Sequence, residues 1–322
     1  MLKHLFQTVA LTVLLATVTS CENNKTVELD MDNYFAWCIV PFDNQNRTPE
    51  ERIEMLKDLG IESYAYDWRM EHLPEMAKEI RLAHENGIDI NAVWMWIDQN
   101  NSIGNLSEGN QKVLDVLEET GLETQIWMSF PESYFEGMTE EELMKKATKM
   151  VSYICDEAKN LGCTVGLYNH GGWFGNPDNL VKIVEALPKK EVGIIFNFHH
   201  AHNLLDDYPQ MVKDMQPHLW AVNLNGMNPI GPKILPIGEG TEEREMIEIL
   251  KNNGFSGPWG ILGHRTDTDV KKVLKRNLKG VKNIMNSTTG EIIFQLNYSQ
   301  EYRIVRYGIW SGCLRSERRL LF

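Results

Sequence analysis

The clearest indication of the fold lies in the stretch Gly166-Leu167-Tyr168-Asn169-His170-Gly171-Gly172-Trp173-Phe174-Gly175. An apolar run from Cys163 to Leu167, typical of a buried strand, leads directly into a histidine, paired glycines and aromatic residues. Polar groups at the carboxyl ends of strands are typical of α/β barrels, which keep their chemistry there. The same order of residues recurs at 192–202, 220–225 and 259–264. We therefore expect four strand ends to converge on one polar, histidine-rich pocket.

Strand-like runs rich in valine, isoleucine and aromatic residues alternate with helical patterns along the chain. The expected strands are 34–40, 63–66, 90–97, 124–130, 164–168, 193–197, 220–224 and 260–262. The expected helices are 49–59, 73–86, 108–119, 140–161, 177–187, 204–215, 242–253 and 267–285. Thr48 and Thr139 are expected N-caps, and glycines such as Gly60 favour a left-handed turn after a helix. This strict alternation predicts an α/β fold, a closed (β/α)₈ TIM barrel over 33–286. The alternative is a doubly wound open sheet, but no G-x-G-x-x-G follows the first strand.

The two ends of the chain depart from the alternation. A positively charged start, an apolar run and small residues before Cys21 resemble a bacterial lipoprotein signal. We expect 1–20 to be a signal peptide and 21–32 a polar tether, so that a lipid on Cys21 is the only membrane contact of an exported bacterial lipoprotein, on the periplasmic side or the cell surface. An uncleaved anchor is the alternative, although the run is shorter than the ~20 residues of a membrane span. For the C-terminal appendage 287–322 the sequence leaves three interpretations open: a short hairpin, a tail without stable structure, or a sequence artefact.

Charge and cysteine content narrow the choice of partner. The formal net charge of −13 disfavours nucleic acid and anionic membrane surfaces, because both reward clusters of lysine and arginine. A neutral small molecule fits better. Of the five cysteines, Cys21 is assigned to the lipid, and Cys38, Cys155, Cys163 and Cys313 contain no closely spaced metal or redox pair. We favour buried free thiols over disulfides for these four.

Three segments carry a resemblance to a known family. They are YNHGGW at 168–173, ILPIGEG at 234–240 and GFSGPWGILGH at 254–264. They resemble the sugar phosphate isomerase/epimerase family with the xylose isomerase-like TIM barrel, and the similarity extends over roughly 34–285. The resemblance implies a barrel enzyme acting on a sugar. Members of the family usually hold a divalent metal through a glutamate at strand five, an aspartate after strand six, a histidine at strand seven and a glutamate at strand eight.

The chain departs from that implied metal site. The corresponding positions are Tyr168, Asn197, Asn223 and Leu262 or Gly263, so all four implied ligands are changed. Hard ions such as Mg²⁺ prefer carboxylate oxygens, whereas imidazoles suit Zn²⁺, Ni²⁺ or Fe²⁺. The candidate metal ligands that remain are His170, His200, His202 and His264. Either the metal has changed its identity, to Zn, Mn, Fe or Ni, or the site has lost it.

Candidate catalytic residues follow from the same strand ends. His170, His200 and His264 are expected to act as acid–base groups or metal ligands, with loop-capping histidines as the alternative. If 199–202 is extended, His200 and His202 face inward and His199 faces outward. Glu239 stands between two glycines in a loop expected to hang over the pocket, where desolvation would raise its pKa and suit it to proton transfer. A solvated loop glutamate is the alternative.

Candidate substrate-binding residues are aromatic, amide or cationic. Aromatic rings at a barrel mouth can stack on sugar rings, and amides orient hydroxyl groups without requiring a cation. Asp67, at the end of the second strand, can also bind hydroxyls. The tryptophans have a core position as their alternative. The expected substrate-binding residues are Arg69, Trp96, Tyr168, Trp173, Asn197, Asn223 and Asn225.

Together these observations predict a sugar isomerase/epimerase-like enzyme that abstracts a proton next to the carbonyl of a keto-sugar, with metal assistance left open. An exported location disfavours phosphorylated sugars, so an unphosphorylated sugar is expected. A keto-sugar hydratase or lyase and a non-catalytic sugar-binding lipoprotein are the alternatives. Metal-dependent phosphodiester cleavage, found in endonuclease relatives of this barrel, is disfavoured by the acidic charge and the missing carboxylates.

Overall fold

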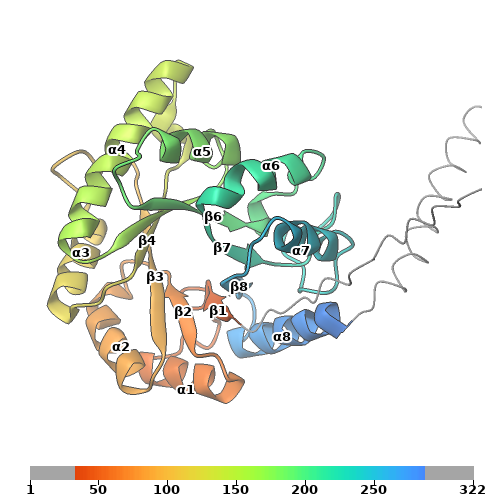
Figure 1. Ribbon diagram of the computed structural model, residues 1–322. Helices are drawn as coiled ribbons and strands as arrows, with labels where there is room; N and C mark the ends of the chain where they lie inside the picture. The colour runs from red at the N-terminus through yellow and green to blue at the C-terminus, as the bar shows by residue number, and fades with distance from the viewer. Residues whose placement is uncertain (1–32, 287–322) are drawn as a thin grey trace, which may run out of the picture.

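The computed structural model describes residues 33–286, which form one closed barrel of eight parallel strands surrounded by helices (Figure 1). The strands are β1 (Tyr34–Trp37), β2 (Ser63–Tyr66), β3 (Asp89–Trp96), β4 (Gln125–Ser129), β5 (Thr164–Tyr168), β6 (Val192–Asn197), β7 (Leu219–Leu224) and β8 (Trp259–Leu262). The predicted (β/α)₈ barrel is confirmed, and each predicted strand overlaps an observed one. The expected signal peptide, tether, Cys21 anchor and C-terminal appendage lie outside the described residues.

The helices begin and end where local chemistry allows. They are α1 (Pro49–Leu59), α2 (Leu73–Glu85), α3 (Glu108–Thr120), α4 (Glu140–Asn160), α5 (Pro177–Glu185), α6 (Tyr208–Met215), α7 (Glu243–Asn252) and α8 (Val270–Asn286). Thr48 and Thr139 each form a capping box with the glutamate three residues on, as predicted. Gly60 ends α1 with φ 68°, in the left-handed region that glycine tolerates. The prediction for α6 was four residues too long at its start, because the chain from 204 to 207 runs mostly through turns.

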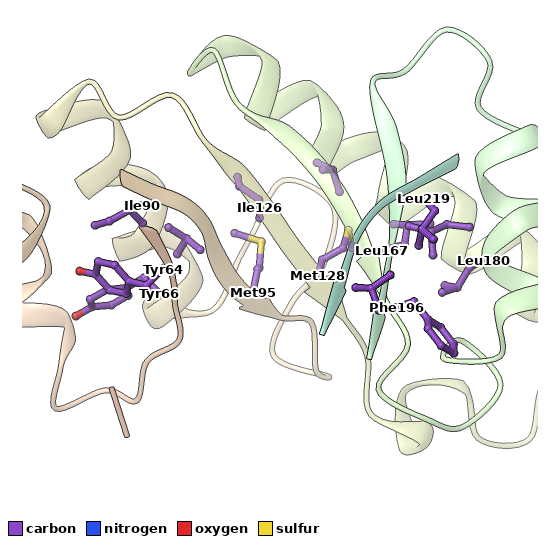
Figure 2. Close-up of a cluster of buried hydrophobic side chains, with 14 of the residues drawn as sticks. Tyr64, Tyr66, Ile90, Met95, Ile126, Met128, Leu167, Leu180, Phe196 and Leu219 are labelled. Carbon is purple, nitrogen blue, oxygen red and sulfur yellow. The ribbon is translucent and has the colours of Figure 1, made fainter. Parts of the chain in front are cut away.

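Two hydrophobic layers hold the barrel together. The inner layer fills the barrel below its mouth and includes Phe35, Trp127 and Ile195. The outer layer lies between the strands and the surrounding helices, where Ile126, Leu167 and Phe196 are fully buried (Figure 2). Parallel strands buried on both faces read as nearly continuous apolar runs, which explains why the strands were visible in the sequence. Each fully buried large side chain stabilises the fold by roughly 1.5–3 kcal/mol.

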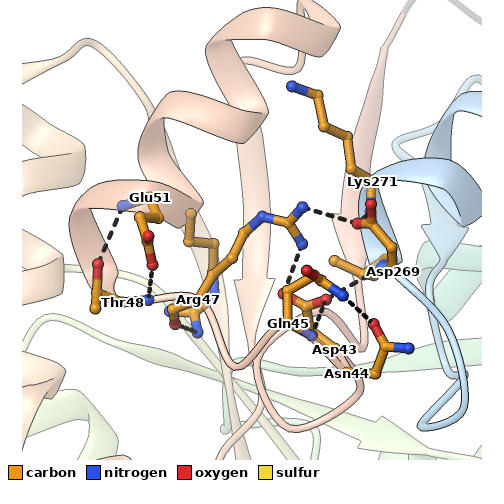
Figure 3. Close-up of polar contacts among 10 residues, drawn as sticks. Asp43, Asn44, Gln45, Arg47, Thr48, Glu51, Asp269 and Lys271 are labelled. Atoms are coloured by element: carbon orange, nitrogen blue, oxygen red, sulfur yellow. Dashed lines mark hydrogen bonds and ion pairs between the residues drawn. The ribbon is translucent and has the colours of Figure 1, made fainter.

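An ion-pair cluster closes the seam where the first and last units of the barrel meet. Strand β1 pairs with β8, and the loop after β1 carries Asp43 and Arg47 (Figure 3). The Arg47 guanidinium donates to Asp43 Oδ2 at 2.7 Å and to Asp269 Oδ1 at 2.8 Å. Asp43 Oδ1 accepts the backbone N–H of Val270, at the start of α8, at 3.2 Å. The β1 loop is thereby fixed to the N-terminus of α8 at the mouth of the barrel.

Cys38, Cys155 and Cys163 are buried and free, which confirms the predicted thiols for these three; Cys21 and Cys313 lie outside the described residues. Strand β1 ends at Trp37 rather than at residue 40, and Cys38 takes a positive φ of 56°. Between residues 33 and 286, no helix combines the length and the apolar character needed to cross a bilayer.

Candidate functional site

A cavity of about 860 Å³ opens at the carboxyl ends of the strands. This volume is in the upper part of the roughly 300–1,000 Å³ range of small-molecule sites. Three of the four predicted strand ends, those of β5, β6 and β8, reach this cavity together with residues of β1, β2 and β3, whereas the predicted contribution of 220–225 on β7 is wrong, because no residue of that segment is in the lining. Its lining consists of Trp37, Cys38, Phe42, Asp67, Trp68, Arg69, Met70, Trp94, Trp96, Asp98, Asn100, Ser107, Glu108, Gly109, Asn110, Tyr168, His170, His200 and His264.

A hydrogen-bonded phenol forms the floor of the cavity. The Trp37 indole N–H donates to Tyr168 Oη at 2.9 Å, across the barrel from β1 to β5. The Asn197 side-chain amide donates to the same oxygen. Burial raises the pKa of Tyr168 well above its ordinary value, so the phenol is neutral. With two donors on its oxygen, Tyr168 keeps one O–H for a third partner.

Asn223 lies beside this phenol at the end of β7. Its side chain is 0% exposed, and its amide lies close enough to the Tyr168 hydroxyl to act on the pKa of that phenol, although neither amide atom makes a hydrogen bond of good geometry with a described residue. The neighbouring strand makes room for it with Gly260, where a Cβ atom would come within 1.9 Å of Asn223 Oδ1. Asn223 does not line the cavity, so it acts on the site through the Tyr168 hydroxyl beside it.

The residues at the implied metal positions do not fit a divalent metal. Tyr168 and Asn197 hydrogen-bond to each other with Asn223 beside them, while Leu262 packs into the inner hydrophobic layer. These positions supply a neutral phenol, two amides and an apolar side chain, whereas hard divalent ions prefer sites that contain negatively charged carboxylate oxygens. Across residues 33–286, no group of three or more histidine, cysteine, aspartate or glutamate side chains is placed to hold a metal ion.

Four imidazoles gather on one side of the cavity. The ring centroids of His170 and His200 are 4.5 Å apart, and those of His199 and His264 are 5.2 Å apart, with 4.6 Å between His199 and His200. Burial, followed by the neighbouring imidazoles, lowers the pKa of His200 to about 2 and that of His264 to about 4. Rings with such pKa values are neutral at neutral pH, and each offers one N–H donor and one acceptor nitrogen.

The expected orientation of the histidines after β6 needs a correction. Residues Phe198–His200 form a 3₁₀ turn rather than an extended segment, so alternation does not apply and His199 joins the imidazole cluster. His202 is held away from the cavity lining, with Nδ1 3.1 Å from the carbonyl oxygen of Asn228 and Nε2 3.0 Å from that of Lys233. Both ring nitrogens of His202 are therefore engaged by a loop.

Asp67 is the buried carboxyl group of the cavity, and the sequence had indicated only a hydroxyl-binding role for it. It is 3% exposed, and its Oδ1 accepts the backbone N–H of Val40 at 3.3 Å. Its Oδ2 has no hydrogen-bond partner within the described chain. Burial raises the pKa of Asp67 to about 6, although the Val40 N–H and the nearby Arg69 oppose that rise. The one available signal was its position directly after β2, since burial cannot be read from the sequence.

Three residues expected in the pocket are placed elsewhere. Glu239 forms a two-pronged ion pair with Arg276 of α8, at 2.6 and 2.7 Å, and does not line the cavity. Trp173 donates its indole N–H to Glu140 at 2.8 Å on the side of α4. Asn225 is buried under the loop after β7, where its amide donates to backbone carbonyls. The expectation that Glu239 hangs over the pocket is thus corrected, because a cation on α8 holds it outside.

Of the aromatic and cationic residues expected at the site, Trp94, Trp96 and Arg69 line the cavity. The Trp96 ring meets His170 edge-on at 4.8 Å and stacks on Trp94 at 5.9 Å. The Arg69 guanidinium lies 5.3 Å from the centroid of the Phe42 ring. Aromatic faces beside hydrogen-bonding groups match the alternating apolar and hydroxyl surfaces of a sugar ring.

The charge of the lining disfavours an anionic ligand. Asp67, Asp98 and Glu108 face the cavity, and Arg69 is the one lysine or arginine among the described lining residues. The imidazoles add no positive charge at neutral pH, because burial lowers their pKa values. A phosphate group would therefore meet more negative than positive charge.

Comparison with known proteins extends these observations. The chain is 29% identical over 161 residues to the uncharacterized protein MJ1311 of Methanocaldococcus jannaschii, a match that covers 47% of this chain and 53% of that protein. The chain thus matches about half the length of this curated relative.

Two solved structures share the fold at low sequence identity. The 3-keto-D-glucoside 4-epimerase YcjR from E. coli has a TM-score of 0.56 and 16% identity, covering 78% of this chain and 99% of its own. The IOLI protein, solved with a bound zinc atom, has a TM-score of 0.61 and 13% identity, covering 79% of this chain and 98% of its own. A family model described as xylose isomerase-like TIM barrel matches residues 53–284, which is more than half of the chain. The chain belongs to the xylose isomerase-like TIM barrel family.

Proposed function

We propose that this protein is a sugar isomerase/epimerase-like enzyme that moves a proton at the carbon next to the carbonyl of an unphosphorylated keto-sugar, without a bound metal. The observation that carries the proposal is the buried Asp67 carboxyl, which has one unpartnered oxygen and a pKa of about 6 in a cavity bordered by neutral imidazoles. The similarity in fold between this protein and a 3-keto-D-glucoside 4-epimerase supports the same reaction class.

The proton transfer follows from the ionisation states in the cavity. At neutral pH Asp67 is largely ionised, since its pKa is about 6, and its carboxylate accepts the proton from the carbon next to the carbonyl. The electron pair of that C–H bond becomes the carbon–carbon double bond of an enolate, and the carbonyl π electrons move to oxygen. A neutral imidazole N–H, from His170 or His200, donates to that oxygen as negative charge develops.

Return of the proton completes the reaction. Delivery to the former carbonyl carbon, while the hydroxyl on the neighbouring carbon passes its proton to the oxyanion and becomes the new carbonyl, gives an isomer. Delivery to the opposite face of the original carbon, with the carbonyl re-formed, gives an epimer. His264 and His170 are the further acid–base groups on the imidazole side of the cavity. The aromatic rings of Trp94 and Trp96 hold the sugar ring, and the Tyr168 hydroxyl below them orients a hydroxyl group of the sugar.

Deuterium labelling tests the proposal. The protein is incubated in deuterated water with 3-keto-glucosides and unphosphorylated ketohexoses, and incorporation at carbon is followed by NMR. We expect incorporation by the wild type and a loss of at least about 100-fold in Asp67→Asn, within the range of general-base catalysis. Glu239→Gln is the matched control and should keep the wild-type rate, because its carboxylate pairs with Arg276 outside the cavity. Full activity in Asp67→Asn together with loss in Glu239→Gln would return proton transfer to Glu239.

A non-catalytic sugar-binding protein is the second candidate. Tyr168 and Asn197 stand at two of the positions where the resemblance implied metal ligands, and the hydrogen bonds that join them to each other and to Trp37 favour this candidate, because they form without a reacting group. Sugar binding measured by calorimetry with no deuterium incorporation would support it. A hydratase would instead change the mass of the sugar by one water molecule, and a lyase would release the group attached to the sugar as a separate product.

A further inference from the structure

The cavity extends well beyond the groups used for proton transfer. One part of it, the β3–α3 arm, lies over the ends of β2 and β3 and the N-terminus of α3. This arm is lined by Trp68, Met70, Asp98, Asn100, Ser107, Glu108, Gly109 and Asn110. None of these side chains has a part in the proposed chemistry. A single sugar ring is a small ligand for a cavity of about 860 Å³, so this arm has room for a second group.

Trp68 is fixed in this arm by its neighbours. Its indole N–H donates to the backbone carbonyl of Trp94 at 2.7 Å. Its ring packs against the first turn of α3, where a Cβ atom on Gly109 would come within 2.7 Å of the ring. Glycine costs stability inside a helix, and here it allows the indole to approach the helix backbone. The structure therefore holds a half-buried indole ring at a defined place in the cavity wall.

Polar groups surround this indole. Asn110 is 1% exposed and donates its amide to the Trp96 carbonyl at 2.7 Å and to Asn101 Oδ1 at 2.8 Å. Its own Oδ1 has no hydrogen-bond partner within residues 33–286. A buried acceptor without a partner, in the lining of a cavity, points to a donor supplied by a ligand or its water. Asp98, Asn100 and Glu108 add acceptors at the rim and no positive charge.

We propose that the β3–α3 arm is a second sugar subsite, so that the substrate is a glycoside of two linked sugars rather than a free monosaccharide. The inference rests on the proposed function: the first ring lies under the imidazoles and the second lies against Trp68. An indole face matches the apolar face of a pyranose, and acceptors such as Asn110 Oδ1 and Asp98 match its hydroxyl donors. The acidic rim disfavours a phosphate or a sugar acid in this position.

Calorimetric titration with paired ligands tests the inference. The ligands are the methyl α- and β-glucosides and the corresponding disaccharides maltose, cellobiose and trehalose, with the 3-keto derivatives as a second set. We expect the wild type to bind at least one disaccharide about tenfold more tightly than the matching methyl glucoside. Trp68→Ala should remove most of that preference, while Trp68→Phe, which keeps an aromatic face, should retain most of it.

Gly109→Ala provides a second variant in case the loss of the indole impairs folding. Alanine is favourable in a helix, but its Cβ forces the Trp68 ring to move, so the preference should fall here too. Equal loss of affinity for both ligand types in these variants, or a wild type that binds methyl glucosides as tightly as disaccharides, would overturn the second subsite and leave the proposed function standing. A wild type that binds neither type would overturn the proposed function and the subsite together.

Discussion

Tyr168 shows how one residue changes what a barrel of this kind can do. It occupies a position where the resemblance implied a glutamate ligand, and its hydroxyl accepts hydrogen bonds from Trp37 and Asn197. A glutamate there would carry a negative charge into a layer of aromatic rings. The phenol carries no charge, so it needs no cation beside it. Neutral hydrogen bonds take the place of the contacts that a carboxylate would make with a metal.

Removal of this hydroxyl has a predictable cost. In Tyr168→Phe the Trp37 N–H and the Asn197 amide lose a buried acceptor, and we expect the free energy of unfolding to fall by about 1–3 kcal/mol. Tyr208→Phe is the matched control, because the Tyr208 hydroxyl makes one hydrogen bond, to the Met246 carbonyl, and should lose about 1 kcal/mol. Urea denaturation measures both. A smaller loss for Tyr168→Phe than for Tyr208→Phe would contradict the role given to the phenol.

The raised pKa of Asp67 predicts that the stability of the folded protein falls as the pH rises. Its pKa is raised from an ordinary 3.8 to about 6 in the folded protein, so the folded state binds the proton more tightly than the unfolded state. The folded protein therefore loses stability as the pH rises from about 4 to about 6, and above pH 6 the full loss of about 3 kcal/mol in the free energy of unfolding is reached. Asp67→Asn removes this cost and should be more stable than the wild type at pH 8, with the difference vanishing near pH 4. Urea denaturation at both pH values measures it; equal stability at pH 8 would mean that the carboxylate has a partner.

At the scale of elements, the seam between β1 and α8 depends on Asp43. In Asp43→Ala, Arg47 loses one of its two carboxylates and the first N–H of α8 loses its acceptor (Figure 3). We expect a loss of about 2–4 kcal/mol of unfolding free energy and faster amide exchange in the first turn of α8. Asp58→Asn breaks the exposed ion pair with Lys271 and should cost less than about 1 kcal/mol. Equal effects would show that the seam is held by packing alone.

Elements were predictable where local chemistry decides them. Capping boxes at Thr48 and Thr139 and the buried apolar strands are written in short stretches of sequence, and the structure confirms them. The extended segment predicted at 199–202 was wrong although a local signal was present, because the Asn197 side chain caps a turn at Phe198–His200 by accepting the N–H of His199. Side chains alternate between two faces only in an extended strand, and the capped turn ends the strand before His199. His199 therefore lies in the imidazole cluster.

At the scale of the whole molecule, the gathering of strand ends was predictable and the loops above them were not. Alternation places the carboxyl ends of all strands on one side, which brought His170, His200 and His264 to one cavity. Glu239 and His202 are held by partners 37 and 31 residues away in the sequence. No local pattern reports such contacts, and the raised pKa of Asp67 likewise depends on the closed barrel around it.

The donor set predicts how the whole protein responds to chelators. We expect dialysis against EDTA and dipicolinate to leave the rate of deuterium incorporation unchanged, because no described group of three ligating side chains is placed to hold a metal. Added Zn²⁺ or Mn²⁺ should not raise the rate, and elemental analysis should find less than one metal per chain. Activity that is lost on chelation and restored by one metal would return His170, His200 and His264 to the role of ligands.

The bond between Trp37 and Tyr168 spans opposite walls of the barrel, and the rings beneath it fill the interior. The barrel is therefore closed beneath the cavity, and under the proposed function a bound sugar rests above that bond. Because the base is closed, product must leave through the same mouth at which the next substrate enters. Product and substrate therefore exclude one another, and inhibition by product is expected to be competitive.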